Sequence, residues 1–533
     1  MLYAVEDFSD EEAAKLRPYF TNLDRPVFAL VNLPEVVKGA LFARYSRSDK
    51  SLRRLFLDEF VPDLDLTGDL TVDASVGLVR AEQLYDRVFF EYGDDSVAQL
   101  GGVHLACEQA SNVLTKVLEW GRLMAYLEQS TRYIPYDSRL SGRYRYWRDP
   151  DVLESRLGAR YVADMDRLFD TYRSMLPALM DWARERYPKD SADSDFVYKQ
   201  TIKAKACDAV RGILPAATLS NVGIYGTGQA YEALLLRMRA HPLPEAREYA
   251  QLILDELRKV IPSFLVRVDR PERGGEWSDY LRQTRDETAA VVERVFGEPL
   301  PDPVDEVTLV DWDPDGEDKV LAAICYPHTH LPEHQLLERV RALSADERLA
   351  LLSGYVGARS NRRHKPGRAF ERTGYRFDVL GDYGAFRDLQ RHRMLTIEWQ
   401  ALTPHHGYEI PDAVAEAGLT ERFEAAMACS AELYDALADE FPEQASYAVS
   451  LAYRIRYAMQ MNAREAMHLC ELRSSPQGHP SYRRVAQAMH TLIAERAGHR
   501  AIAATMRHVD HGVYELERLA AERAAADRRA ARG

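Results

Sequence analysis

Two stretches that lie far apart in the chain carry residue types that bind anionic ligands. Arg391, His392 and Arg393 are consecutive, so two permanent cations and one titratable ring stand together. Adjacent guanidinium groups suit the diphosphate of a dinucleotide cofactor, because each can hold an anion through two parallel hydrogen bonds. The alternative is an ordinary charged helix end, where such triplets are common.

The second stretch alternates polar side chains. Glu128, Ser130 and Arg132 project to one side if the segment is extended, and would then present an acceptor, a hydroxyl and a fixed cation together. Serine and arginine are suitable donors for a phosphate group. The alternative is a surface strand with mixed polar residues and no ligand.

A third stretch, residues 462–473, has the pattern of an amphipathic helix. On its polar face Arg464 and His468 stand one helical turn apart, so both can reach the same ligand. The alternative is a half-buried helix whose arginine pairs with a surface carboxylate and whose histidine is an interior residue.

Together these stretches resemble the flavin-dependent thymidylate synthases. The family signature is an Arg-His-Arg followed closely by Glu-x-Ser-x-Arg-Tyr. In this chain the first part stands at residues 391–393 and the second at residues 128–133. Residues 462–473 resemble the family helix Asn-x-Arg-Ser-Leu-x-His-Phe-x-x-Leu-Arg, and residues 211–215 resemble its Arg-x-x-Leu-Pro.

The resemblance implies a role for each matching residue. Flavin-binding roles fall on Arg391, His392, Arg393, Glu371, Asn462, Arg464 and His468. Contacts with deoxyuridylate (dUMP) fall on Glu128, Ser130, Arg132, Arg211 and Arg473. Arg473 is also the implied catalytic residue, because a guanidinium there can stabilise negative charge on the pyrimidine ring as C5 becomes nucleophilic. The resemblance implies no metal ligand.

The motifs are incomplete in each half of the chain, and the gaps are complementary. Only Arg122 remains of the first-half triplet, where residues 120–122 read Trp-Gly-Arg. In the second half, residues 446–450 lack the arginine of Arg-x-x-Leu-Pro, and Trp399 stands where the signature has glutamate. Pro366 and Arg368 also replace a histidine and a hydroxyl residue of the family. Each half has lost what the other has kept.

The elements that would position these residues form a weak internal repeat. Short apolar strands are predicted at residues 27–31 and 307–310. Apolar residues at Leu105, Ala106, Leu114 and Leu118 predict a long helix in the first half. The second half shows a similar pattern, at Phe377, Val379, Leu380, Phe386 and Leu389. We therefore expect an α+β protein with two tandem copies of a helix-rich α/β unit. Each copy would hold a small central sheet, as the resemblance implies.

The length of 533 residues exceeds what one hydrophobic core accommodates. The stretch 297–318 is rich in Pro, Asp and Glu, which is typical of a boundary. We expect an N-terminal half at 1–296 with the nucleotide-binding motif, a linker at 297–318, and a C-terminal half at 319–533 with the flavin-binding motif.

The overall charge and the apolar runs exclude several classes of protein. A formal net charge of -14 argues against a general nucleic-acid-binding protein. No apolar run approaches the roughly 18 residues that a membrane-spanning helix needs. The five cysteines are scattered, without a CxxC pair, which is typical of reduced thiols. The expected location is the cytoplasm.

The expected function is that of an FAD-dependent methyltransferase. The resemblance implies methylation of dUMP to dTMP, with methylenetetrahydrofolate as carbon donor and NADPH as reductant of the flavin. Two alternatives remain open: a flavoenzyme that acts on another pyrimidine nucleotide, and a non-catalytic nucleotide-binding paralogue. Because the family works as a homotetramer with sites between subunits, a duplicated chain is expected to form a homodimer that resembles a tetramer.

Overall fold

The computed structural model describes residues 3–33, 38, 41–42, 45, 48–61, 102–191, 193–297 and 302–516, with single positions beyond. The chain divides into two compact units. Unit 1 comprises Met1–Arg173, Ile213–Pro301 and Glu424–Ser450. Unit 2 comprises Ser174–Gly212, Asp302–Phe423 and Leu451–Gly533. Each unit is described by itself below.

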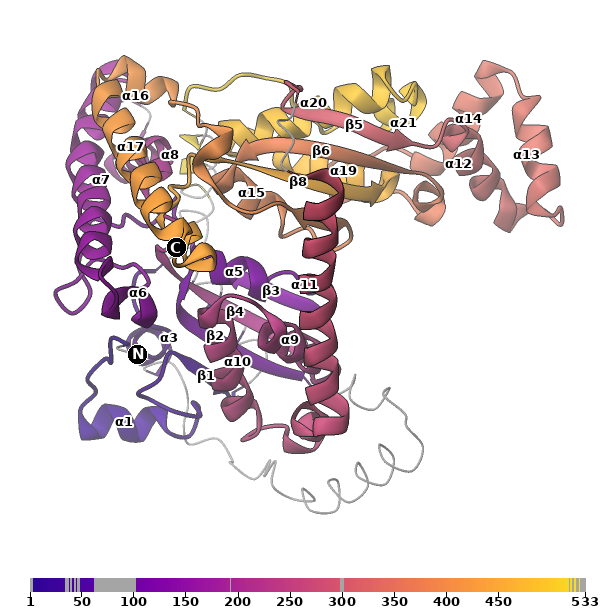
Figure 1. Ribbon diagram of the computed structural model, residues 1–533. Helices are drawn as coiled ribbons and strands as arrows, with labels where there is room; N and C mark the ends of the chain where they lie inside the picture. Colours follow the sequence, from indigo (N-terminus) through magenta and orange to yellow (C-terminus); the bar gives the residue numbers. More distant parts are fainter. Residues whose placement is uncertain are drawn as a thin grey trace. The chain divides into compact units, whose positions relative to one another are not determined.

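Unit 1 is built on a four-stranded antiparallel sheet in the order β1-β2-β4-β3 (Figure 1). Its strands are β1 (Val27–Leu30), β2 (Gly102–Ser111), β3 (Met124–Glu128) and β4 (Leu219–Thr227). The strand β1 is fully buried, and its Phe28 and Leu30 side chains join a core that also contains Leu16, Phe20 and Phe56. The register of β2 against β4 shifts between Cys107 and Ala110, where a bulge interrupts the pairing.

Unit 2 contains a second antiparallel sheet whose order, β5-β6-β8-β7, repeats the first (Figure 1). Its strands are β5 (Val307–Trp312), β6 (Gly374–Asp382), β7 (Thr396–Trp399) and β8 (Arg454–Asn462). The α+β class and the tandem duplication with one small sheet per copy are therefore confirmed. The strands predicted at 27–31 and 307–310 are present as β1 and β5.

The helices that follow the strands repeat as well. A short helix follows the second strand of each sheet, and a longer helix follows the fourth strand. They are α5 (Asn112–Leu118) and α15 (Tyr383–Leu389), then α9 (Gly228–Ala240) and α19 (Ala463–Arg473). Each of the four begins after a capping residue whose side chain accepts a backbone N–H of the first turn. The capping residues are Ser111, Asp382, Thr227 and Asn462, respectively. These caps fix where strand becomes helix.

The prediction of one long helix in the middle of each half is wrong. Leu105 and Ala106 lie in β2, and Phe377 and Val379 lie in β6, so the helix begins only after the cap. The error has a physical reason: short runs of buried apolar residues satisfy a helical and a strand period equally well. The residues Ser111 and Asp382 mark the change of element.

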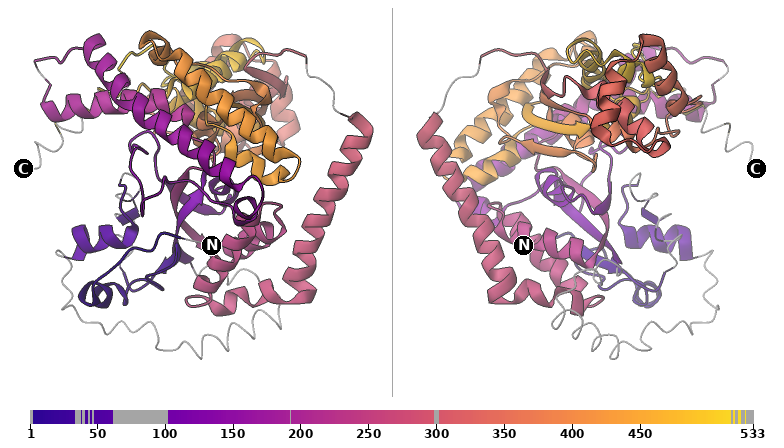
Figure 2. Two further views of the ribbon diagram at one scale, coloured as in Figure 1. Left: turned by 60° about the vertical axis from the view of Figure 1, so that its left-hand side comes forward. Right: turned by 90° about the vertical axis from the view of Figure 1, so that its right-hand side faces the viewer.

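The remaining helices cover the sheets or form arms. In unit 1 these are α1 (Asp10–Leu16), α3 (Leu52–Leu55), α6 (Pro150–Glu154), α10 (Pro244–Leu257), α11 (Glu276–Phe296) and α18 (Pro442–Ala445). In unit 2 these are α8 (Asp195–Val210), α12 (Gly316–Cys325), α13 (Glu333–Arg341), α14 (Ala345–Val356), α16 (Asp412–Glu416), α20 (Pro480–Glu495) and α21 (Arg500–Thr505). Figure 2 shows α11 as one long straight helix, and only Ser278 of its side chains is buried. Among the described residues, none of the helices is long and apolar enough to cross a membrane.

The two units do not coincide with the two contiguous halves of the sequence. The arm that precedes β4, residues 174–212, belongs to unit 2, and the arm that precedes β8, residues 424–450, belongs to unit 1. The helices α7 (Gly158–Arg186) and α17 (Thr420–Ala438) each begin in one unit and end in the other. The stretch predicted as a linker, 297–318, contains β5 and the start of α12; residues 298–301 of it lie outside the described part. Its Asp-rich second part, around Asp311, is therefore strand rather than linker.

Candidate functional site

Three arginines surround one carboxylate in unit 2. Arg473 Nη1 lies 3.5 Å from Asp388 Oδ1, and Arg211 Nη1 lies 3.8 Å from Asp388 Oδ2. Arg391 Nη2 also donates to Asp388 Oδ1, and Arg473 Nη2 donates to the Asp388 carbonyl oxygen. The catalytic and two anion-binding arginines of the sequence prediction therefore meet at a residue that the prediction did not include.

The charge balance around Asp388 favours an anionic ligand. Three guanidinium groups surround this carboxylate, and the charge of one of them, Arg211, also acts on the buried carboxyl of Asp382. The site is largely shielded from water, because the side-chain exposed fractions are 4% for Arg211, 12% for Asp388 and 14% for Arg473. Charges interact more strongly where water is excluded. A phosphate group suits a cluster in which cations outnumber anions, and the fork of a guanidinium matches its oxygens.

Each of the three arginines stands at or just beyond the C-terminal end of a helix. Arg211 is the C-cap residue of α8, Arg473 is the last residue of α19, and Arg391 follows α15 by two positions. A helix C-terminus carries partial negative charge, so a cation there is stabilised. The spacing of Asp388 and Arg391, three positions apart, lets their side chains meet.

His392 links Arg473 to a second acidic residue. His392 Nδ1 lies 2.9 Å from Glu465 Oε1, and Arg473 Nε donates to His392 Nε2 at 3.0 Å. Because Nε2 accepts a hydrogen bond, the neutral ring carries its proton on Nδ1 and donates it to Glu465. Burial lowers the pKa of His392 well below its ordinary value, and the charges of Arg473 and Arg391 lower it further. Glu465 thus holds the tautomer that orients Arg473.

The sequence interpretation missed Glu465. It stands where the family helix has serine, and its side chain is buried. Burial raises the pKa of Glu465, while the charges of His468, Lys365 and Arg464 lower it. The signal available in the sequence was an acidic residue in the first turn of a helix, three positions before His468. Its partner, His392, is 73 positions away, so periodicity could not reveal the pair.

His468 lies beside His392, with ring centroids 5.4 Å apart. Burial lowers the pKa of His468 to about 4, although the negative charge of Glu465 acts to raise it. Ligand atoms of His392, Glu465 and His468 all lie within 4.8 Å of one another, which is metal-ligand spacing. A cation bound at His392 Nδ1 would have to displace the proton shared with Glu465, and Lys365 and Arg362 would repel it. The arrangement is therefore better suited to holding a proton than to holding a metal.

The other residues with predicted flavin-binding roles form a smaller group at the start of α19. Arg464 Nε donates to the Pro366 carbonyl at 2.9 Å, and its Nη1 lies 3.2 Å from Glu371. The carboxylate of Glu371 also pairs with Arg368 at 3.0 Å. Asn462 caps α19, because its Oδ1 accepts the Glu465 N–H at 2.9 Å. Its role in the described structure is structural.

The remaining member of the triplet, Arg393, is exposed. The side chain of Arg391 is 31% exposed, whereas His392, which stands between the two arginines, is buried. The sequence brings the three residues together at the end of α15, and only the middle one is enclosed.

The stretch at residues 128–132 in unit 1 is not extended throughout, contrary to the sequence interpretation. The strand β3 ends at Glu128, and a turn follows in which the Tyr133 and Ile134 N–H groups donate to the Ser130 carbonyl. Ser130 Oγ accepts the Arg132 N–H at 3.3 Å, a local bond that favours a turn over a strand. The three side chains therefore do not alternate along one strand face.

Glu128 and Arg132, which belong to unit 1, are nonetheless buried, with exposed fractions of 4% and 8%. Glu128 Oε2 lies 3.4 Å from Lys116 Nζ, which also donates to Glu119 at 2.6 Å. Buried charges are held in pairs because an isolated one would be costly. The predicted contacts of Glu128, Ser130 and Arg132 with a nucleotide stay predictions.

The neutral histidines predict a loss of stability in acid. In the unfolded chain a histidine gains a proton below a pH of about 6.5, whereas folded His468 does so only near pH 4. The unfolded state therefore binds more protons between these values, so stability falls as pH falls through this window. We expect the melting temperature to drop between pH 7 and pH 5, and the drop to be smaller in His468→Gln. Scanning calorimetry measures both. The matched control is His330→Gln, at an exposed loop position, and an equal drop in both variants would contradict the assignment.

Comparison with known proteins places these features in a family context. A family model described as "Thymidylate synthase complementing protein" matches two segments, residues 59–263 and 308–497. A UPF0159 protein of Chlamydia muridarum is 40% identical over 526 residues, covering 98% of this chain and 99% of that protein. A UPF0159 protein of Chlamydia pneumoniae is 40% identical over 495 residues, covering 92% and 93%. A UPF0159 protein of Thermoplasma acidophilum is 32% identical over 512 residues, covering 91% and 97%.

Proposed function

Because the chain belongs to the Thy1 family of thymidylate synthase complementing proteins, which are flavin-dependent thymidylate synthases, we propose that it methylates deoxyuridylate. The carbon donor is methylenetetrahydrofolate, and NADPH reduces an FAD cofactor. The relatives' printed name, UPF0159 protein, states no substrate, so the proposal is supported by the family and by the site.

The observation that carries the proposal is the meeting of Arg211, Arg391 and Arg473 around Asp388. Arg211 comes from the first repeat of the sequence and the other two come from the second, yet all belong to unit 2. The motif that one repeat has lost is thus supplied by the other. The gathering of three guanidinium groups suits the phosphate group of a pyrimidine nucleotide.

The residues of unit 2 also fit a flavin. Arg393 and Arg464 offer charge to a diphosphate, and His392 and His468 offer neutral rings of low pKa. When bound, the flavin supplies the hydride chemistry of the reaction. The protein's own part is to bind the nucleotide, to exclude water and to hold Arg473 in one orientation through His392 and Asp388. The predicted homodimer stays a prediction from the duplication.

The test is direct. Purified protein incubated with FAD and freed of excess cofactor is expected to keep a visible flavin spectrum, which NADPH bleaches. Adding dUMP and methylenetetrahydrofolate to the reduced protein should then yield dTMP, measured by chromatography. A protein that binds no FAD and gives no dTMP would exclude the enzyme and leave a nucleotide-binding paralogue.

A second candidate is a flavoenzyme for a different pyrimidine nucleotide. It is favoured by Glu465, a buried carboxylate that replaces the serine of the family helix beside His392. An acidic group here changes the hydrogen bonds available around Arg473. Reduced enzyme supplied separately with dUMP, UMP and dCMP separates the two candidates, because only turnover of dUMP gives dTMP.

A further inference from the structure

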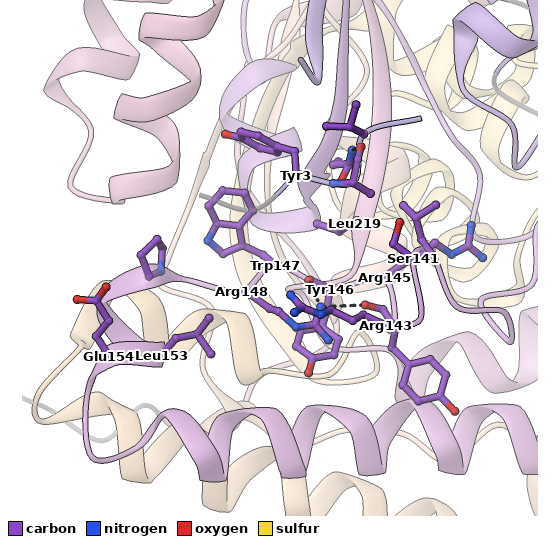
Figure 3. Close-up of a pocket in the computed structure, with 16 residues that line it drawn as sticks. Tyr3, Ser141, Arg143, Arg145, Tyr146, Trp147, Arg148, Leu153, Glu154 and Leu219 are labelled. Atoms are coloured by element: carbon purple, nitrogen blue, oxygen red, sulfur yellow. Dashed lines mark hydrogen bonds between the residues drawn. The ribbon is translucent and has the colours of Figure 1, made fainter. Parts of the chain in front are cut away.

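Unit 1 contains two adjoining cavities that no predicted site residue lines. Their volumes are about 640 and 470 Å³. They share a wall that includes Leu140, Ser141 and Arg145, so they form one groove with two compartments. Figure 3 shows the first compartment, with the labelled side chains of Tyr3, Arg143, Arg148 and Leu153 around it. This volume is typical of small-molecule sites.

The shared wall is formed by a hairpin turn with unusual backbone angles. Leu140 and Arg143 exchange backbone hydrogen bonds, and the two residues between them, Ser141 and Gly142, have φ of 50° and 77°. Gln109, at the bulge of β2, has φ of 57° and also lines both compartments. Non-glycine residues with positive φ cost free energy and are found preferentially at binding sites. Two of the three among the described residues line this groove.

The N-terminal segment closes one side of the groove. Gln109 holds Ala4 through two hydrogen bonds, because Oε1 accepts the Ala4 N–H at 3.1 Å and Nε2 donates to the Ala4 carbonyl at 3.0 Å. Tyr3 Oη donates to Glu248 at 2.5 Å. The strained conformation of Gln109 thus positions a wall of the first compartment. The wall is built by side-chain bonds and not by sheet pairing.

Cations outnumber carboxylates along the lining of the groove although the chain is acidic. Eight arginines and lysines line the two compartments against five carboxylates, and three of the eight, Lys50, Arg54 and Arg148, also pair with carboxylates outside the lining. The whole chain carries -14. Arg143 and Arg25 are exposed, and within the described structure their guanidinium groups have no carboxylate partner. An anion entering the groove would therefore meet cations that are not already neutralised.

The first compartment also exposes apolar side chains. Val5, Leu140 and Leu153 are 52%, 42% and 36% exposed, and all three line it. Large apolar residues gathered in a concave surface mark a ligand site more often than scattered ones do. Val5 and Leu140 belong to the wall that the two compartments share, whereas Leu153 lines the first compartment alone, and the rest of the second compartment is lined mainly by charged and polar residues. The two compartments therefore suit different parts of one molecule.

We infer that this groove binds an elongated organic anion, with its apolar body beside Leu153 in the first compartment and its negative charges along the arginines of the hairpin, Arg143 and Arg145, and of the second compartment. A nucleoside triphosphate and a folate with a polyglutamate tail both have this chemistry. The site is separate in composition from the cluster around Asp388, since all of its residues belong to unit 1. The inference does not depend on thymidylate synthesis.

The test is calorimetric titration of the full chain, without flavin, using dTTP, pteroyltriglutamate and inorganic tripolyphosphate in low salt. At least one of the two organic anions is expected to bind more tightly than tripolyphosphate, which lacks the apolar body. Arg143→Gln should weaken that binding about tenfold, the value of one hydrogen bond to a charged group. Leu153→Asn should weaken the binding of the organic anion and leave the binding of tripolyphosphate unchanged. Added KCl should weaken all binding.

The matched control is Arg173→Gln, which removes an exposed arginine of unit 1 that lines neither compartment. Arg143 is also exposed, so both variants are expected to have the melting temperature of the unaltered protein. Binding of dTTP alone would identify a nucleotide site, and binding of pteroyltriglutamate alone would identify a folate site. The inference is overturned if neither organic anion binds, or if Arg143→Gln and Arg173→Gln bind equally. A protein that makes no dTMP but passes this test would refute the proposed function and leave the groove assigned.

Discussion

Replacing Arg473 by lysine is expected to lower kcat/KM for deoxyuridylate by about 100- to 1,000-fold. The guanidinium of Arg473 is held on two sides, since Nε donates to His392 and Nη2 donates to the Asp388 carbonyl. Lysine keeps the charge but loses the planar fork, so it cannot make both bonds and also face a pyrimidine ring. Formation of dTMP, followed by chromatography under conditions below saturation, measures the loss.

The variant is chosen so that a structural role alone would not produce the result. Lysine leaves a cation near Asp388, so the melting temperature should stay within a few degrees of the unaltered protein. Arg341→Gln serves as the control, because Arg341 is an exposed arginine of unit 2 whose ion-pair partners among the described residues are Asp315 and Asp318. Full activity in Arg473→Lys would remove Arg473 from the reaction.

Replacing Asp388 by asparagine is expected to destabilise the protein by about 3 kcal/mol, the usual consequence of removing one partner from a buried ion pair. The substitution leaves Arg211, Arg391 and Arg473 close together without their shared carboxylate. If the cluster is an anion site, inorganic phosphate or dUMP should recover a large part of the lost stability, because a ligand that binds only the folded state stabilises it. Urea unfolding with and without phosphate measures both changes.

A matched ion pair separates anion rescue from general salt effects. Asp378 in β6 pairs with Arg456 alone among the described ion pairs, so Asp378→Asn removes a carboxylate without leaving a cluster of cations. Phosphate should raise the free energy of unfolding of this variant no more than it raises that of the unaltered protein. Equal recovery in both variants would mean that the arginines around Asp388 do not form an anion site.

Local features of the sequence predicted the elements that have strong local signals. The apolar runs at β1 and β5 were recognised, and the amphipathic pattern of residues 462–473 placed the α19 helix to within one residue. The change from strand to helix after β2 and β6 was missed, since buried apolar residues fit both periods. The turn after Glu128 was missed because Ser130 forms it through its own side chain.

The candidate site was predicted in part for the same reason. Arg391, Arg473 and Arg211 were identified from motifs, but Asp388, which joins them, belongs to no motif. Glu465 was passed over because its partner, His392, is distant in sequence. Such pairings depend on which elements the fold brings together, and no local pattern encodes that. The groove of unit 1 was likewise invisible, because it is assembled from the N-terminal segment, β2 and a hairpin.

The assignment of the two arms has an evolutionary consequence. Residues 174–212 complete unit 2 and residues 424–450 complete unit 1, so neither repeat supplies every part of its own unit. In separate chains this arrangement would require two different subunits to find each other in equal numbers. Fusion into one polypeptide guarantees that ratio at synthesis. Once it was guaranteed, each repeat could discard a motif that its neighbour retained, because the two copies are always inherited and made together.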